Sequence, residues 1–67
     1  MNTHTIQKNI ESLGFTVDVT YDSNWDTHTV VAHFHGNEWA TVERHSLQQA
    51  MIESLYLVKS GVYGSML

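Results

Sequence analysis

The stretch SLQQAMIESLYLVKSG, residues 46–61, carries the most complete helix pattern in the chain. Ser46 followed three residues later by Gln49 is a capping box, in which the serine hydroxyl accepts the backbone N–H of Gln49. Side chains that suit a buried stripe then recur at spacings of three and four: Leu47, Ala50, Met51, Ser54, Leu55 and Val58. Gly61 is placed to end the helix in the left-handed conformation. The rest of the chain must supply a surface that covers this stripe.

The apolar character of this region extends beyond the stripe. Three more apolar residues lie on the flanks of the helix: Ile52, Tyr56 and Leu57. The last segment, VYGSML at residues 62–67, is also rich in apolar residues, but Gly61 and Gly64 disfavour a continuing helix. We therefore expect a single domain over residues 1–61. The short apolar tail over residues 62–67 is expected to fray, to pack back on the domain or to reach a neighbouring subunit.

A second, shorter helix is predicted at the N-terminal end. Ile6 and Ile10 share one face of a segment of about nine residues, which is too short to be stable alone in water. Thr3 or Thr5 can cap its start, and Gly14 can end it. This helix therefore also needs a surface on which to lie.

Three strands are predicted between the two helices, over residues 15–21, 29–35 and 38–44. The first alternates, with Phe15, Val17, Val19 and Tyr21 on the face that we expect to be buried. The polar segment 22–28 connects the first two strands, and Gly36-Asn37 forms a two-residue turn with glycine first. We predict an α+β fold of order α-β-β-β-α, a three-stranded antiparallel sheet with both helices packed on one face.

That turn would fix the register of the last two strands, with His35 opposite Glu38 and Val31 opposite Val42. The face away from the helices would then display an apolar cluster among polar residues: Thr16, Asp18, Thr20, Val31, His33, His35, Glu38, Ala40 and Val42. Exposed apolar groups rimmed by polar ones often mark contact with another protein. The alternative is a few β-branched residues that a solvent-facing sheet tolerates. Either a foreign partner or a second copy could cover the cluster.

The loop sequence Asp22-Ser23-Asn24-Trp25-Asp26 matches the first five positions of a calcium-binding loop. Thr27 and His33 then stand where that motif needs a glycine and a bidentate glutamate, so calcium binding is not expected. We expect the Asx side chains to bond to their own backbone. Trp25 either packs on the edge of the core or anchors a partner, as tryptophan often does at interfaces.

His33, His35 and Glu38 are weak candidates for a metal site, because two imidazoles and a carboxylate are a known zinc ligand set. No residue that would orient either imidazole is identifiable from the sequence. We expect solvent-facing histidines and no cofactor. A small-ligand site for a nucleotide or metal at a homodimer interface, with His33 and His35 as its polar groups, is the alternative function.

The composition limits the classes of function. Three Lys and Arg residues against seven Asp and Glu residues give a net charge of −4, which makes nucleic-acid binding unlikely. No apolar run is long enough to span a membrane, and no signal peptide is visible, so we expect a cytoplasmic protein. The chain has no cysteine, no Gly-x-Ser-x-Gly elbow and no glycine-rich phosphate loop. We expect no enzymatic activity.

The order of elements resembles that of the double-stranded RNA-binding domain. That family reads phosphates with a lysine-rich start to its last helix, where this chain has only Arg44 and His45, so RNA binding is not carried over. The residues Trp39-Ala40-Thr41 followed by Ser46-Leu47-Gln48-Gln49-Ala50 resemble small phage and prophage proteins of the "ABA sandwich" type. This resemblance implies a phage-encoded accessory protein, a class that includes anti-CRISPR proteins and other inhibitors of host proteins.

The sequence therefore predicts a non-enzymatic protein-binding accessory protein that inhibits a host or defence complex. It would act in the cytoplasm of the host cell, and a homodimer is expected as one possible state. The predicted partner-binding residues lie in the loop and on the open sheet face: Asp22, Trp25, Asp26, Val31, His33, His35, Glu38, Ala40 and Val42.

Overall fold

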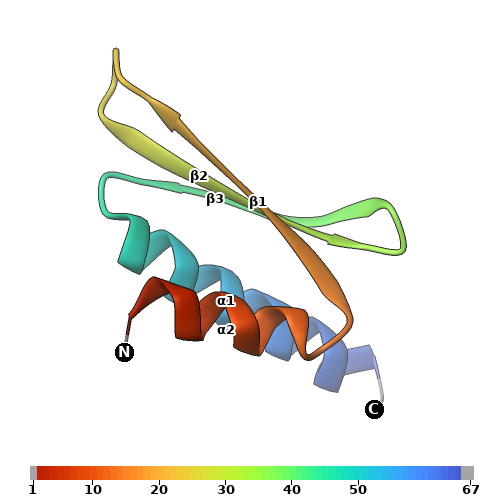
Figure 1. Cartoon of the computed structure of the whole chain (residues 1–67). Helices are drawn as coiled ribbons and strands as arrows, with labels where there is room; N and C mark the ends of the chain where they lie inside the picture. The colour runs from red at the N-terminus through yellow and green to blue at the C-terminus, as the bar shows by residue number, and fades with distance from the viewer. Residues whose placement is uncertain (1, 66–67) are drawn as a thin grey trace.

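Two helices lie under one face of a three-stranded antiparallel sheet of order β1-β2-β3 (Figure 1). The computed structural model describes residues 2–65, and the side chains of residues 2–61. The elements follow in the order α1 (Thr3–Glu11), β1 (Phe15–Asp22), β2 (Thr27–Phe34), β3 (Asn37–Arg44) and α2 (Leu47–Ser65). The predicted α+β fold is confirmed.

Helix α1 is nine residues long, and its buried face carries Ile6 and Ile10 as predicted. Its N-cap is Asn2, whose Oδ1 accepts the backbone N–H of Thr5 at 2.8 Å. The prediction that Thr3 or Thr5 caps this helix was therefore wrong, because Asn2, one residue before Thr3, accepts the hydrogen bond at the start of the helix. Gly14 follows the helix with φ of +94°, a conformation that glycine adopts without strain.

Helix α2 begins with the predicted cap, since Ser46 Oγ accepts the backbone N–H of Gln49 at 3.3 Å. Ala50, Met51 and Val58 are buried on its inner face. Ser54, also fully buried, donates its hydroxyl hydrogen bond to the Ala50 carbonyl at 2.8 Å. A polar residue is therefore tolerated in the core because its hydroxyl is satisfied within its own helix.

The helix does not end at Gly61 but continues to Ser65, so the predicted stop was wrong. A Cβ added to Gly61 would lie 2.6 Å from Cζ2 of Trp39. Glycine therefore stands at this position because the indole of β3 packs directly against the helix backbone, and helical packing outweighs the low helix propensity of glycine. The contacts predicted for the tail involve the side chains of residues 62–67, which lie outside the residues whose side chains the structure describes.

The turn between β2 and β3 differs from the prediction. His35 and Gly36 form it, with φ of +53° and +81°, and Phe34 pairs with Asn37. Positive φ at both central residues defines the type I′ hairpin turn, which matches the right-handed twist of the strands. Histidine is among the non-glycine residues that enter this region more readily, so glycine occupies the second position and not the first.

A β-bulge follows this turn and fixes the face that each residue of β3 presents. His33 pairs with Glu38 and Ala32 with Ala40, which leaves Trp39 as the extra residue. Beyond the bulge Val30 pairs with Val42, and only 5% of Val42 is exposed. The predicted pairing of Val31 with Val42 was wrong by one residue, which moves side chains to the opposite face.

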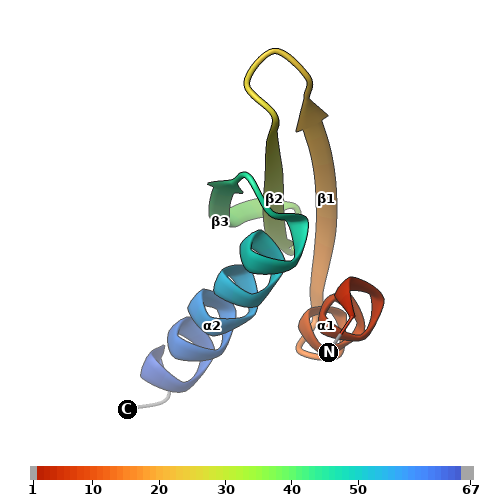
Figure 2. The ribbon, with the colours of Figure 1, turned by 90° about the vertical axis from the view of Figure 1, so that its left-hand side faces the viewer.

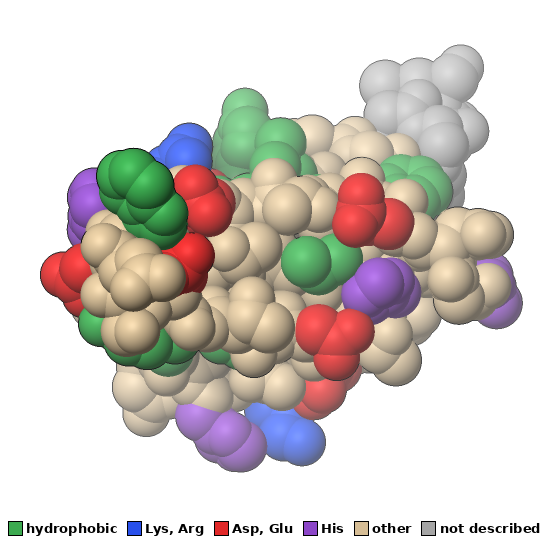
Figure 3. Space-filling view, turned by 90° about the horizontal axis from the view of Figure 1, so that it is seen from above, with side chains coloured by type: hydrophobic (Ala, Val, Ile, Leu, Met, Phe, Trp, Pro, Cys, Tyr) green, Lys and Arg blue, Asp and Glu red, His purple; other side chains and the backbone are tan. Residues whose placement is uncertain are grey.

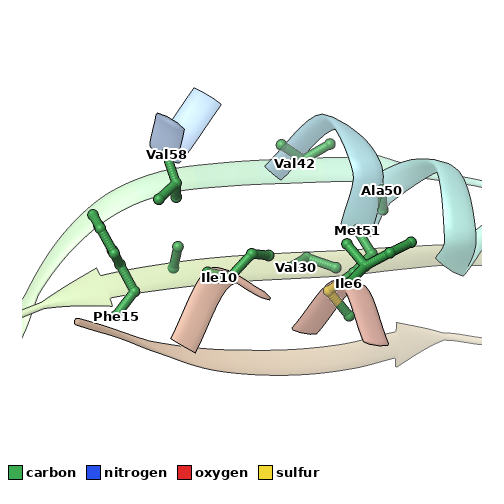
Figure 4. Close-up of a cluster of buried hydrophobic side chains, with 9 residues drawn as sticks. Ile6, Ile10, Phe15, Val30, Val42, Ala50, Met51 and Val58 are labelled. Carbon is green, nitrogen blue, oxygen red and sulfur yellow. The ribbon is translucent and has the colours of Figure 1, made fainter. Parts of the chain in front are cut away.

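The core lies between the sheet and the two helices, with contributions from every element (Figure 4). Phe15 closes one end of it, with its ring centroid 4.9 Å from that of Phe34 and 5.6 Å from that of Trp39. The buried hydrophobic residues are Ile6, Ile10, Phe15, Val30, Ala32, Val42, Ala50, Met51 and Val58. No helix among the described residues is long and apolar enough to cross a membrane.

The register can be tested by paired substitutions in β3. Val42→Asp places a carboxylate in the core, and we expect it to lower the free energy of unfolding by about 3 kcal/mol or more. Thr41→Asp points to solvent and should cost about 1 kcal/mol or less. Urea denaturation followed by circular dichroism measures both. A larger loss for Thr41→Asp than for Val42→Asp would contradict the register.

Candidate functional site

The β1–β2 hairpin extends beyond both helices and carries a hydrogen-bonded loop at its tip (Figure 2). Asp22 Oδ1 accepts the backbone N–H of Asn24 at 2.9 Å, the expected bond of an Asx side chain to its own loop. Tyr21 donates its hydroxyl hydrogen bond to Asp26 Oδ1 at 2.9 Å. His45, on the connection to α2, donates from Nδ1 to the Asp26 carbonyl at 2.9 Å. The loop is thus fixed at both of its ends.

Trp25 stands at the tip of this loop with 74% of its surface exposed. Of the two predicted states for this residue, packing on the core edge is therefore excluded. Its neighbour Asp26 has φ of +52°, a left-handed conformation that aspartate tolerates better than most residues. The loop therefore holds its shape through Asp22, Asp26 and their hydrogen bonds, and presents the indole to solvent.

Two residues below the loop are more exposed than the alternation predicted. Val19 and Tyr21 share the helix-facing side of β1 with Phe15, yet they are 41% and 55% exposed. The hairpin stands clear of the helices at this end, so no core covers these side chains (Figures 1 and 2). Tyr21 instead contacts the imidazole of His28, with ring centroids 4.8 Å apart. The exposure of Val19 and Tyr21 depends on the lengths and angles of the helices. The alternation of apolar and polar residues in β1 carries no information on these.

The open face of the sheet is a regular grid set by the register. Its side chains form three cross-strand rows, Thr16–His33–Glu38, Asp18–Val31–Thr41 and Thr20–Thr29–Glu43. Of the predicted partner-binding residues, Val31, His33 and Glu38 therefore lie on this face. Ala40 and Val42 do not, because the shifted register turns them toward the helices. His35 does not either, since it lies in the turn with its ring centroid 4.2 Å from that of Phe34.

This face carries three carboxylates, on Asp18, Glu38 and Glu43, and none of its nine grid residues is Lys or Arg. Figure 3 looks down on it and shows acidic side chains spread among polar ones, with a small apolar area between them. His33 Nε2 lies 3.0 Å from Asp18 Oδ2, an ion pair when the imidazole is protonated. The open face is therefore an acidic surface.

Two of the basic side chains are paired elsewhere. Arg44 forms a two-point contact with Glu53 of α2, with Nε 2.7 Å from Oε2 and Nη2 3.0 Å from Oε1. Lys8 lies 3.5 Å from Glu11 on α1. These positive charges neutralise acids on or beside the helices, which leaves the acids of the open face without a Lys or Arg neighbour in the grid.

The metal-site hypothesis depended on His33, His35 and Glu38 sharing one strand face. The structure brings His33 and Glu38 together as cross-strand partners but places His35 in the turn. Within residues 2–65, no three His, Cys, Asp or Glu side chains gather as metal ligands would, and no pocket is formed. The arrangement offers surfaces for contact, and its chemistry is that of an exposed aromatic loop and an acidic sheet.

Comparison with known proteins gives no match to a family model, to a curated protein or to a solved structure. The candidate site therefore consists of two surfaces defined by geometry. One is the tip loop, meaning Asp22, Trp25 and Asp26. The other is the open face, of which Val31, His33 and Glu38 were predicted.

The hydrogen bond from Tyr21 to Asp26 raises the pKa of the phenol above its usual value of 10.0, with the negative charge of Asp26 adding to the effect. Asp26→Asn should return this pKa toward 10.0, measured by tyrosinate absorbance with Tyr21→Phe identifying the signal. Because the pKa of Tyr21 is raised in the folded state, its hydrogen bond to Asp26 stabilises the fold fully below the unfolded pKa of about 10. This contribution to folding stability is lost as pH rises through the folded-state pKa. An unchanged titration in Asp26→Asn would contradict the bond.

Proposed function

We propose that this protein is a non-enzymatic protein-binding module whose anchor is Trp25. The observation that carries the proposal is an indole with 74% of its surface exposed on a loop that is otherwise tied down by hydrogen bonds. A fixed loop loses little conformational freedom when it binds, which favours affinity. Tryptophan is also one of the residue types enriched at the energetic centres of protein interfaces.

The charges around the anchor indicate the chemistry of the partner. Asp22 and Asp26 flank the indole, and the acids of the open face lie on β1 and β3. A partner with an apolar pocket for the indole and basic residues around it would be complementary in charge, which raises the association rate and disfavours acidic competitors. Val31, His33 and Glu38 would then provide a second contact area.

The finer form of the proposal is that the partner belongs to a host or defence complex and that the protein is a phage-encoded inhibitor acting in the host cytoplasm. The resemblance of residues 39–50 to small phage accessory proteins supports this form. The acidic open face supports it too, because many host and defence complexes present basic surfaces to nucleic acid. An acidic protein could occupy such a surface without binding nucleic acid itself.

Affinity capture and a matched pair of aromatic substitutions test the general proposal. A partner captured with the wild type from host lysate, identified and then purified, should bind Trp25→Ala at least roughly 30-fold more weakly, equivalent to about 2 kcal/mol. Tyr56→Ala removes an aromatic side chain of similar exposure, 71%, from α2 and should bind like the wild type. Thermal melts show whether both variants remain folded. Equal affinity of Trp25→Ala and the wild type would overturn the proposal.

A separate assay tests the finer form. Phage plating on cells that carry an active defence system should rise when the wild type is expressed, and Trp25→Ala should reduce this effect. If expression of the wild type does not change phage plating while binding to a captured partner is intact, the proposal of an inhibitor is wrong. The proposal of a protein-binding module would then still hold.

A further inference from the structure

The outer edge of β1 is the less protected of the two edges of the sheet. All eight residues of β1 pair with β2 in one continuous register, and the described residues form no backbone hydrogen bond to the other side of β1. Its sequence, FTVDVTYD, contains no proline and no lysine, and its pairing contains no bulge. Of the common devices that prevent edge-to-edge pairing it has only charged side chains, on Asp18 and Asp22. The opposite edge, β3, does carry such a bulge, at Trp39.

The same strand leaves apolar surface uncovered. Val19 and Tyr21 face the helix side of the sheet, but α1 contacts the other end of β1, near Phe15 (Figures 1 and 2). One strand thus combines unpaired backbone groups along its edge with bare apolar side chains at its far end. A covering element for this end should pair with the edge and pack under the sheet on the same side.

We propose that a second copy of this chain covers the edge of β1 and its exposed end. The two β1 strands pair antiparallel, in the register that sets Val19 opposite the second copy's Val19. The two sheets then form one continuous six-stranded sheet, as in other cases of strand addition at an exposed edge. The interface is related by a two-fold axis perpendicular to the sheet, so both copies contribute the same residues.

The chemistry of β1 selects this register. On the helix side, Tyr21 lies opposite the second copy's Val17, a favourable aromatic and β-branched pair. On the open side, Asp18 lies opposite Thr20, so no carboxylate faces another. Moving the pairing by two residues in one direction sets Asp18 opposite Asp18, and in the other direction opposite Asp22, and both place like charges together. Moving it by one residue sets the apolar side chains of one copy against the polar ones of the other.

The two-fold axis also supplies the missing cover. In each copy α1 lies beside the Phe15 end of β1 (Figure 1). Antiparallel pairing brings the Phe15 end of the second copy next to the Tyr21 end of the first, on the same side of the sheet. The second copy's α1 therefore comes to the end of the hairpin where Val19 and Tyr21 are bare. Because strands join edge to edge, both open faces stay uncovered and become one larger acidic surface.

Solution mass tests the association. Light scattering over a dilution series should give twice the 7.6 kDa chain mass for the wild type. Val19→Asp sets two carboxylates against each other at the axis and should give a folded monomer, because Val19 lies outside the core. Ile52→Asp, at a site of similar exposure on α2, should remain a dimer. A monomeric wild type at all concentrations, a dimeric Val19→Asp variant, or loss of the dimer only in Ile52→Asp would overturn the proposal.

A cysteine pair tests the register, since the chain has no cysteine of its own. Val19→Cys sets two thiols directly opposite, with Cβ atoms about 5 Å apart, and mild oxidation should link most of the chains into a covalent dimer. In Val17→Cys the two thiols lie four residues apart along the strands, roughly 13 Å, and should stay unlinked. Linking of Val17→Cys in preference to Val19→Cys would refute the register. Neither cysteine variant changes Trp25 or needs a foreign partner. A failure of this inference can therefore be told apart from a failure of the proposed function.

Discussion

The β-bulge at Trp39, which follows the type I′ turn at His35-Gly36, is the constraint on which the rest of the structure depends. The turn pairs Phe34 with Asn37, and the bulge removes Trp39 from the ladder. Together these two features place Val42 opposite Val30, between the sheet and α2. Because side chains alternate between faces, the same turn without the bulge would pair Val30 with Thr41, burying Thr41 and exposing Val42. The identity of the core and that of the open face are thus decided by the one extra residue in β3.

The bulge also determines how α2 is held. Trp39 turns its indole toward the helix side, where it meets Phe15, Phe34 and the backbone at Gly61. At the other end of β3, Arg44 holds Glu53 near the start of the same helix. Strand β3 therefore fixes α2 at two separated points, one by close packing and one by a charged pair. Between these points the helix lays its small and medium side chains on the sheet.

Unequal cover by the two helices shapes the surface of the protein. Helix α2 lies under β2 and β3, whereas the nine-residue α1 covers only one end of β1 and leaves the hairpin tip free. The protein has three surfaces with different chemistry. The tip loop presents an exposed indole between acids, the open face is an acidic grid, and the edge of β1 is a strand with free backbone groups. The proposed foreign partner uses the first two surfaces and the proposed second copy uses the third.

The sequence by itself determined the order of elements, the capped start of α2, its buried stripe and the loop that presents Trp25, because each rests on local periodicity or on hydrogen bonds within a few residues. Only the tertiary structure decided the register of β3, the continuation of α2 past Gly61 and the exposure of Val19 and Tyr21. These features depend on an extra residue in β3, on an indole from a distant strand and on where a short helix stops. None of these leaves a signal in the pattern of neighbouring residues.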